Sequence, residues 1–360
     1  MDFSKLSKWA ELLLDTGKRN NLINFRDTKL GTVDVVAPDF STLFSKAEHS
    51  AVFEVFDPKL ENQEEDFDDL DTVIEYSSSE KYIPKKDYLN AYLPKVKKNQ
   101  ILLYNYVNKP IQALNKIGKK AKSAIEETGV NIAYLAFCFI YWKEKETDEN
   151  YFKAPLLLAP IAIMNESPIE PFYVKVTDDE IIVNPTFNYK LQNEYGLKLP
   201  DFDEDLGIDQ YLLSVRELLD RLNWKVSSEC KIGIFSFLKI NMYKDLKDNA
   251  EKVAESKDVQ ALLGEFSEQA QEQLEEEQAQ PKVSTEHKNV VDADASQQEA
   301  IERAKSGKSF VLQGPPGTGK SQTITNVIAE CLADGKKVLF VSEKLAALSV
   351  VYDKLKNAGL

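Results

Sequence analysis

The spacing of apolar residues in the first 250 positions changes repeatedly between helical and strand-like periods. A period of about 3.6 residues over positions 3–13 predicts an amphipathic helix with Phe3, Leu6, Trp9 and Leu13 on one face. Pro110 begins a second predicted helix, and two more are expected over residues 186–195 and 209–222. Between residues 130 and 176, near-continuous runs of β-branched and aromatic residues predict buried strands. This mixture predicts an α+β domain over residues 1–250.

Two shorter patterns complete this part of the chain. The segment PFYVKVTDDEIIVNP, residues 171–185, predicts a hairpin with its turn at Thr177–Asp179. Residues 224–235 predict a pair of strands, and residues 236–246 a helix.

Two acidic segments interrupt the chain. Six of the eight residues from Glu64 to Asp71 are acidic, so we expect a surface insertion over residues 62–98. From Gly264 to Gln280 the chain carries six Glu and five Gln without Lys or Arg. This composition predicts an acidic Gln/Glu-rich linker over residues 251–289.

The pattern after the linker becomes strand, helix, strand, helix. Strands are predicted at residues 309–312 and 338–342, a helix at 319–333, and a last helix that ends before Gly359. Residues 290–360 therefore predict the start of an α/β RecA-like (P-loop NTPase) parallel sheet. With two predicted strands, that sheet would be incomplete and the domain truncated, because such a domain needs at least about five strands.

The sequence GPPGTGKS, residues 314–321, has the residue types of a phosphate-binding loop between the predicted strand and helix. Glycines let the backbone wrap around phosphate oxygens, and the helix N-terminus favours negative charge. We expect Lys320 to contact the β- and γ-phosphates as a catalytic residue, and Ser321 to act with it and bind Mg²⁺. The residues predicted to bind ATP in and beside this loop are Gly314, Pro315, Pro316, Gly317, Thr318, Gly319, Lys320, Ser321 and Gln322.

Upstream, Gln297 lies in the sequence DASQQEAI, residues 294–301. A Gln amide offers one donor face and one acceptor, which match adenine N6–H and N7. Gln297 is therefore predicted to select ATP, although a surface Gln at a helix start is the alternative.

At the end of the second predicted strand, Ser342 and Lys344 are candidate contacts to a nucleic-acid backbone. Arg19, in the segment RNNLINF, is a candidate phosphate ligand, and a structural role in capping a neighbouring element is favoured for it.

Composition narrows the possible partners. The net charge is −14, so a nucleic-acid site has to be local rather than a property of the whole surface. The three cysteines are far apart in apolar contexts, as expected of reduced thiols in a cytoplasmic protein. Two histidines make a His-based metal site improbable. No apolar run is long enough to cross a membrane.

The motifs together resemble the superfamily 1 (Upf-like) helicases that carry the N-terminal domain of unknown function 4011. The segments that carry the resemblance are RNNLINF, GVNIAYLAFCFIYWKE, APLLLAPI, TDDEIIVNP, IGIFSFLKINMYKDL, DADASQQEAI, VLQGPPGTGKSQTITNVIAE and GKKVLFVSEKLAAL. At Ser342-Glu343-Lys344 the chain departs from the Ala-Pro-Ser/Thr-Asn typical of the Upf-like branch, which leaves the roles of Ser342 and Lys344 open.

The resemblance implies an ATP-dependent helicase or translocase acting on nucleic acid, with DNA favoured over RNA. The Walker B carboxylates and a second motor domain are not found in the sequence, so the chain is expected to be inactive alone and completed by a downstream segment or a second polypeptide. Two alternatives stay open: a stand-alone N-terminal binding or recruitment module, and an AAA+ ATPase.

Overall fold

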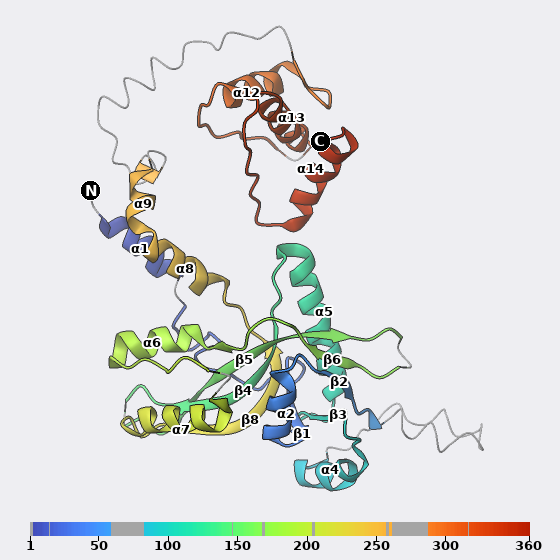
Figure 1. Ribbon diagram of the computed structural model, residues 1–360, viewed down its shortest axis with the longest axis vertical. Coiled ribbons are helices and arrows are strands. Elements are labelled where there is room, and N and C mark those ends of the chain that lie inside the picture. Colours follow the sequence, from blue (N-terminus) through green and yellow to red (C-terminus); the bar gives the residue numbers. More distant parts are fainter. Residues whose placement is uncertain are drawn as a thin grey trace, which may run out of the picture. The chain divides into compact units, whose positions relative to one another are not determined.

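The computed structural model describes residues 3–13, 15–58, 83–145, 147–167, 170–203, 206–256, 259–260, 287–315 and 317–360. They form two compact units (Figure 1). The barrel unit consists of residues 11–125 and 130–244, and the second unit of residues 1–10, 126–129 and 245–360. Residues 62–82 of the predicted acidic insertion, and residues 257–258 and 261–286 of the predicted linker, lie outside the described residues.

Strands of the barrel unit close into a ring. Among the described residues, seven strands pair in the order β4-β8-β1-β3-β2-β6-β5, and β5 pairs with β4 again to close the barrel. The strands are β1 (Thr32–Ala37), β2 (Val52–Val55), β3 (Gln100–Tyr104), β4 (Ala133–Trp142), β5 (Phe152–Met164), β6 (Tyr173–Val176) and β8 (Lys225–Ile234). Among the strands of the described residues, β2 and β3 alone pair in parallel. The short β7 (Ile182–Val183) pairs with Leu157 and Leu158 of β5, on the edge of β5 that also pairs with β6.

The longest ladders lie where the sequence is most apolar. Strand β4 pairs with β5 from Tyr134↔Pro160 to Trp142↔Phe152, and on its other side with β8. A bulge interrupts the second ladder, because the two steps from Phe137 to Phe139 on β4 oppose the three steps from Cys230 to Ser227 on β8. Nearly every residue of β4 is buried, which explains its continuous apolar run.

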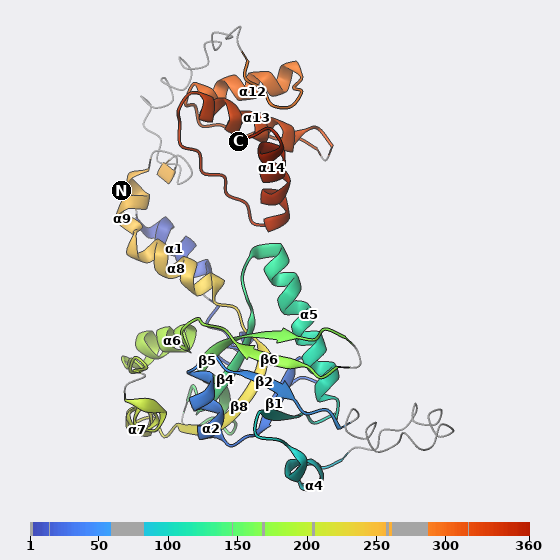
Figure 2. The ribbon, with the colours of Figure 1, turned by 45° about the vertical axis from the view of Figure 1, so that its right-hand side comes forward.

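Helices complete the hydrophobic core of the barrel unit. They are α2 (Phe40–Ala47), α4 (Lys85–Tyr92), η1 (Leu93–Lys95), α5 (Pro110–Thr128), α6 (Pro185–Tyr195) and α7 (Gly207–Asp220). Helix α5 buries Ala113, Leu114 and Ile117 in the same core as the strands. Its Gly118 lies so close to Ile163 that a Cβ would come within 3.1 Å of that side chain. Figures 1 and 2 show α6 and α7 together on one side of the barrel and α5 on another.

The helices predicted in this unit are confirmed with clear end signals at α6. Asn184 caps its N-terminus by accepting the N–H of Phe187, Pro185 occupies the first turn, and Gly196 ends the helix in the left-handed region. Helix α1 (Phe3–Leu13) begins the chain, and α8 (Leu238–Asp248) follows β8. In the part of the chain that the structure describes, no helix is long and apolar enough to cross a membrane.

The predicted fold class is wrong. The sheet is a closed, mostly antiparallel barrel, and no open parallel RecA-like sheet begins in residues 290–360. Residues 309–312 and 338–342 form no strand, and Val311 and Leu339 are each 87% exposed. The physical reason is that an extended segment becomes a strand only when a neighbour offers its backbone N–H and C=O groups. Neither segment has such a neighbour among the described residues.

Two local predictions in the barrel unit are also wrong. Strands β6 and β7 do not form a hairpin with each other, because each pairs with β5, at Ile161–Met164 and at Leu157–Leu158. Residues 225–234 form the single long strand β8 instead of two strands.

The second unit is helical, with α9 (Ala250–Glu255), α12 (Ala295–Lys305), α13 (Lys320–Ala333) and α14 (Leu345–Asn357). Helices α13 and α14 agree with the helices predicted there.

Candidate functional site

The glycine loop, residues 314–321, leads directly into the N-terminus of α13. Gly319 is the N-cap of α13 with φ 76°, and Gly317 has φ 86°. Both conformations are left-handed, which favours glycine. A Cβ on Gly314 would come within 2.6 Å of the Thr318 hydroxyl. The sequence thus has glycine where the loop needs an unusual backbone angle or close approach, and the loop brings backbone to the positive end of a 14-residue helix.

Side chains of the loop bind its own carbonyl groups. Lys320 Nζ donates to the carbonyls of Gly314 at 2.5 Å and Pro315 at 2.8 Å, and the Thr318 hydroxyl donates to Pro315 at 2.9 Å. The ammonium group of Lys320 is therefore held at the concave backbone of the loop. Among the described residues, the Ser321 hydroxyl has no hydrogen-bond partner, and it remains available to a ligand. Pro316, another predicted binding residue, lies outside the described residues.

Gln297 touches the loop from α12. Its Nε2 donates to the carbonyl of Thr318 at 3.2 Å, and its Oε1 accepts the N–H of Asp294 at 3.2 Å. The Asp294 side chain in turn accepts the N–H of Gln297 at 2.8 Å, which completes a capping box. Hydrogen bonds from the Ser296 hydroxyl and from Gln297 N–H hold the pKa of Asp294 below its ordinary value.

The segment before α12 is fixed to α13 by buried polar groups. Asn326, fully buried, accepts the N–H groups of Val290 at 3.0 Å and Val291 at 3.1 Å and donates to the carbonyl of Val291 at 2.9 Å. These hydrogen bonds hold residues 290–291 against α13. Helix α12, which carries Gln297, begins four residues later. Asn326 thereby sets the position of Gln297 relative to the glycine loop.

A buried ion pair fixes the other end of the same helix pair. Glu330 is fully buried and accepts hydrogen bonds from Lys305 Nζ at 2.8 Å and from Lys288 N–H. Burial alone would raise the pKa of Glu330, but these hydrogen bonds hold it below its ordinary value. The hydrogen bond to Glu330 raises the pKa of Lys305. The ion pair keeps α12 against α13.

The structure brings together Gln297 and the glycine loop but not all of the predicted site residues. Ser342 and Lys344 lie before α14, where Lys344 N–H donates to the Ser342 hydroxyl at 3.4 Å. In the part of the chain that the structure describes, no hydrogen bond or ion pair joins either side chain to the glycine loop. Gln322 faces Gly319, since a Cβ there would lie 2.8 Å from its Oε1.

The sequence analysis missed Asn326 and Glu330. Both lie on the buried face of α13 and look like ordinary helix residues in the sequence, because their partners are 25 or more positions away along the chain. The available signal was that both polar residues occupy positions on the side of the predicted helix that carries its apolar residues.

No group of three or more His, Cys, Asp or Glu among the described residues could hold a metal ion. A Mg²⁺ ion that arrives with a nucleotide needs fewer protein ligands, because the phosphate oxygens supply several.

Two family models match the chain. The model described as "Protein of unknown function (DUF4011)" matches residues 12–191, half of the chain. A second model, described as an AAA domain, matches residues 292–359 and includes α12, the glycine loop, α13 and α14.

Two curated bacterial proteins are similar to the chain. An "Uncharacterized ATP-dependent helicase MG140 homolog" of Mycoplasma pneumoniae is 28% identical over 275 residues, which are 67% of this chain and 24% of that protein. An "Uncharacterized ATP-dependent helicase MG140" of Mycoplasma genitalium is 27% identical over 271 residues, 66% of this chain and 23% of that protein. The aligned part thus spans about a quarter of the length of these relatives. No solved structure matches the chain significantly.

Proposed function

Since the chain belongs to the superfamily 1 helicases that carry the domain of unknown function 4011, we propose that its glycine loop binds the triphosphate of ATP within an ATP-dependent helicase or translocase. The names of both relatives contain the words ATP-dependent helicase. ATP hydrolysis by such a protein moves it along nucleic acid, and we favour DNA over RNA as that partner.

The observation that carries this proposal is the shape of the glycine loop. Two glycines in the left-handed region lead into the N-terminus of α13, and Lys320 stands over the loop carbonyls. A triphosphate would offer Lys320 several anionic oxygens, which bind an ammonium group more strongly than neutral carbonyls do. The positive end of the helix dipole favours the same ligand.

Lys320, Ser321 and Gln297 have separate roles in this proposal. Lys320 stabilises negative charge that develops on the transferred phosphoryl group, and Ser321 offers its free hydroxyl to Mg²⁺. The bound Mg²⁺ neutralises charge on the phosphate oxygens. Gln297 contacts adenine through its second N–H and the second lone pair of Oε1, so that it keeps its bonds to Thr318 and Asp294.

Ser342 and Lys344 are proposed to contact the nucleic-acid backbone. They precede α14, and their side chains are not used by the glycine loop. We place the protein in the cytoplasm. Its three cysteines are free and buried, as expected of a chain that keeps its thiols reduced.

An equilibrium titration with a fluorescent, non-hydrolysable ATP analogue and Mg²⁺ tests the proposal. The wild type should bind the analogue, and Lys320→Ala should weaken the affinity at least about tenfold, which corresponds to about 1.4 kcal/mol. Lys337→Ala is the matched control, because Lys337 is an exposed lysine of the same unit outside the loop. Equal affinities for the wild type and Lys320→Ala would rule out this role for the loop.

A further inference from the structure

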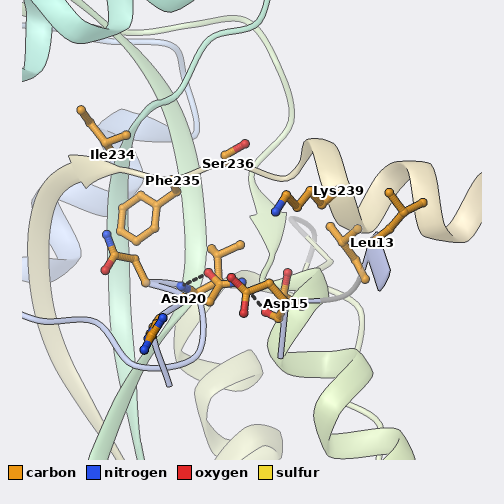
Figure 3. A pocket seen from close by; sticks show the side chains of 12 residues that line it. Leu13, Asp15, Asn20, Ile234, Phe235, Ser236 and Lys239 are labelled. Carbon is orange, nitrogen blue, oxygen red and sulfur yellow. Dashed lines mark hydrogen bonds between the residues drawn. The ribbon is translucent and has the colours of Figure 1, made fainter. Parts of the chain in front are cut away.

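A cavity lies in the barrel unit, and all the residues that line it belong to that unit. Its volume is about 380 Å³. That volume falls within the range of small-molecule sites in proteins. It lies between the loop of residues 15–22, the end of β8 and the first turn of α8, and Figure 3 shows Asp15 and Asn20 opposite Ser236 and Lys239. We call it the loop cavity. The residues that line it are Leu13, Asp15, Arg19, Asn20, Asn21, Leu22, Thr186, Ile234, Phe235, Ser236, Lys239 and Ile240.

Hydrogen bonds inside the loop fix its shape. Asn20 Nδ2 donates to the carbonyl of Asp15 at 2.6 Å, and Asn20 Oδ1 accepts the N–H of Leu22 at 2.9 Å (Figure 3). Asn24 Nδ2 donates to the carbonyl of Lys18 at 3.1 Å. Asn20 and Asn24 of the RNNLINF segment are therefore structural residues.

The barrel anchors the same loop from two sides. Asn184, fully buried, donates to the carbonyl of Leu22 at 2.7 Å, and Trp142 Nε1 donates to the carbonyl of Ile23 at 2.8 Å. A loop with these anchors has one position relative to the barrel. The side chains that it presents to the cavity are consequently placed before any ligand arrives.

Two cationic side chains of the loop cavity are left unused by the fold. Arg19 and Lys239 are exposed, and neither has a hydrogen bond or an ion pair with any described residue. The structural role favoured for Arg19 from the sequence, capping a neighbouring element, thus has no partner group in the described structure. The lining contains one carboxylate, Asp15, which accepts the N–H of Gly17 at 3.3 Å. Two cations and one anion give the cavity a net positive charge, and the first turn of the 11-residue α8 adds to it.

One hydroxyl of the lining also has no partner among the described residues. Thr186 lines the cavity and is 3% exposed, and its hydroxyl has no hydrogen bond with any described residue. This hydroxyl can therefore donate to or accept from a ligand in the cavity. Asn21 and Ser236 add exposed polar side chains that are likewise free among the described residues.

The remaining lining is apolar. This part of the wall consists of Leu13, Leu22, Ile234, Phe235 and Ile240. A ligand that matches the whole cavity has an anionic group for Arg19 and Lys239, hydroxyl or carbonyl groups for Thr186, and a flat or apolar part. A nucleotide combines these three features: a phosphate, a sugar and a base.

From these features we infer that the loop cavity binds one nucleotide unit through its phosphate, at a site separate from the glycine loop. Arg19 and Lys239 bind the phosphate oxygens with charge-assisted hydrogen bonds, and the apolar wall contacts the base. The nucleotide has two possible sources, a free nucleotide or the phosphorylated end of a strand, which offer the same chemistry to the cavity.

The test titrates the full 360-residue chain in the Lys320→Ala background with two probes, thymidine 5′-monophosphate and a 5′-phosphorylated oligothymidylate. Neither probe carries the triphosphate that the glycine loop is proposed to bind, so this experiment and that of the proposed function can fail independently. The double substitution Arg19→Gln and Lys239→Gln should weaken binding at least about tenfold. The matched control is Lys225→Gln, an exposed lysine at the opposite end of β8. Thermal melting of every variant shows whether it is folded.

Binding of either probe that the double substitution weakens and the control preserves supports the site, and the probe that binds identifies the source of the nucleotide. No binding of either probe would overturn the inference. Equal binding of a probe by the wild-type cavity and by the double variant would also overturn it.

Discussion

Gln297 Nε2 and the carbonyl of Thr318 are joined by a hydrogen bond of 3.2 Å. This bond links the first turn of α12 to the glycine loop before α13. The same amide completes the capping box of α12 through the N–H of Asp294. Gln297 therefore has two structural contacts besides the adenine contact proposed for it.

Substitutions at Gln297 separate these roles. Gln297→Glu keeps an acceptor for the N–H of Asp294 but loses the donor to Thr318, whereas Gln297→Ala loses both. We expect Gln297→Ala to lower the free energy of unfolding by about 0.5–1 kcal/mol and Gln297→Glu to lower it less. Both should weaken ATP binding and reduce the preference for ATP over GTP. Titrations with the two nucleotides measure this, and an unchanged preference would contradict the adenine contact.

A side chain at Gly319 should displace the Gln297 amide from its contact with the glycine loop. Its φ is 76°, and a Cβ would lie 2.3 Å from Gln297 Nε2. Gly335 has a similar φ of 73° with nothing within 4 Å of its Cβ position, so Gly335→Ala isolates the cost of the backbone angle, about 1–2 kcal/mol. Gly319→Ala should lower the free energy of unfolding further and weaken ATP binding, which Gly335→Ala should leave intact. Equal effects of the two substitutions in urea unfolding and in titration would refute the close contact.

Most helices could be predicted because their signals are local. Pro110 and the apolar stripe of α5, the cap and glycine of α6, and the glycine loop before α13 all lie within a few residues of the element they define. The glycine loop and Gln297 were found for the same reason. The sequence predicted that both bind the same nucleotide. It did not predict the hydrogen bond between Gln297 and Thr318, which are 21 positions apart.

The barrel could not be predicted in this way. Its closure depends on pairing between distant segments, such as β1 with β8, where Asp34 opposes Lys231. Strands β2 and β3 are short and pair in parallel across the acidic insertion, so they leave no hairpin signal. The error at residues 309–312 has the opposite origin: an apolar, β-prone segment predicts a strand, but strand formation depends on a partner.

Asn184 should be the most sensitive polar position of the barrel unit. It donates to the carbonyls of Leu22 and Pro155 and accepts the N–H of Phe187, all in a buried site. Asn184→Ala leaves these groups without partners, and we expect a loss of about 2–4 kcal/mol. The exposed Asn21→Ala should change the free energy of unfolding by less than about 0.5 kcal/mol. Urea unfolding followed by tryptophan fluorescence measures both, and similar losses would show that the hydrogen bonds of Asn184 contribute little.

Glu229 should make the barrel unit sensitive to acid. Burial alone would raise the pKa of Glu229, but hydrogen bonds from Lys153 and Tyr141 hold it below its ordinary value. A carboxylate with a lowered folded-state pKa stabilises the fold above its unfolded pKa, near 4.5, and this contribution is lost as pH falls through the folded pKa. At neutral pH, Glu229→Gln should therefore be less stable than the wild type, and the difference should shrink below pH 4.5.

Unfolding measured from pH 7 to pH 3 tests this expectation, with Glu217→Gln as the control at an exposed position of α7. The control should follow the wild type throughout. A gap between wild type and Glu229→Gln that stays constant with pH would contradict the assignment.

Amide hydrogen exchange of the full chain, with and without Mg²⁺ and ATP, tests the central claim most directly. The account predicts that ATP slows exchange in residues 314–322 and in the first turn of α12 around Gln297, and that Lys320→Ala removes this protection. Protection confined to other parts of the chain, or the same protection in Lys320→Ala, would contradict the assignment of the glycine loop as the ATP site.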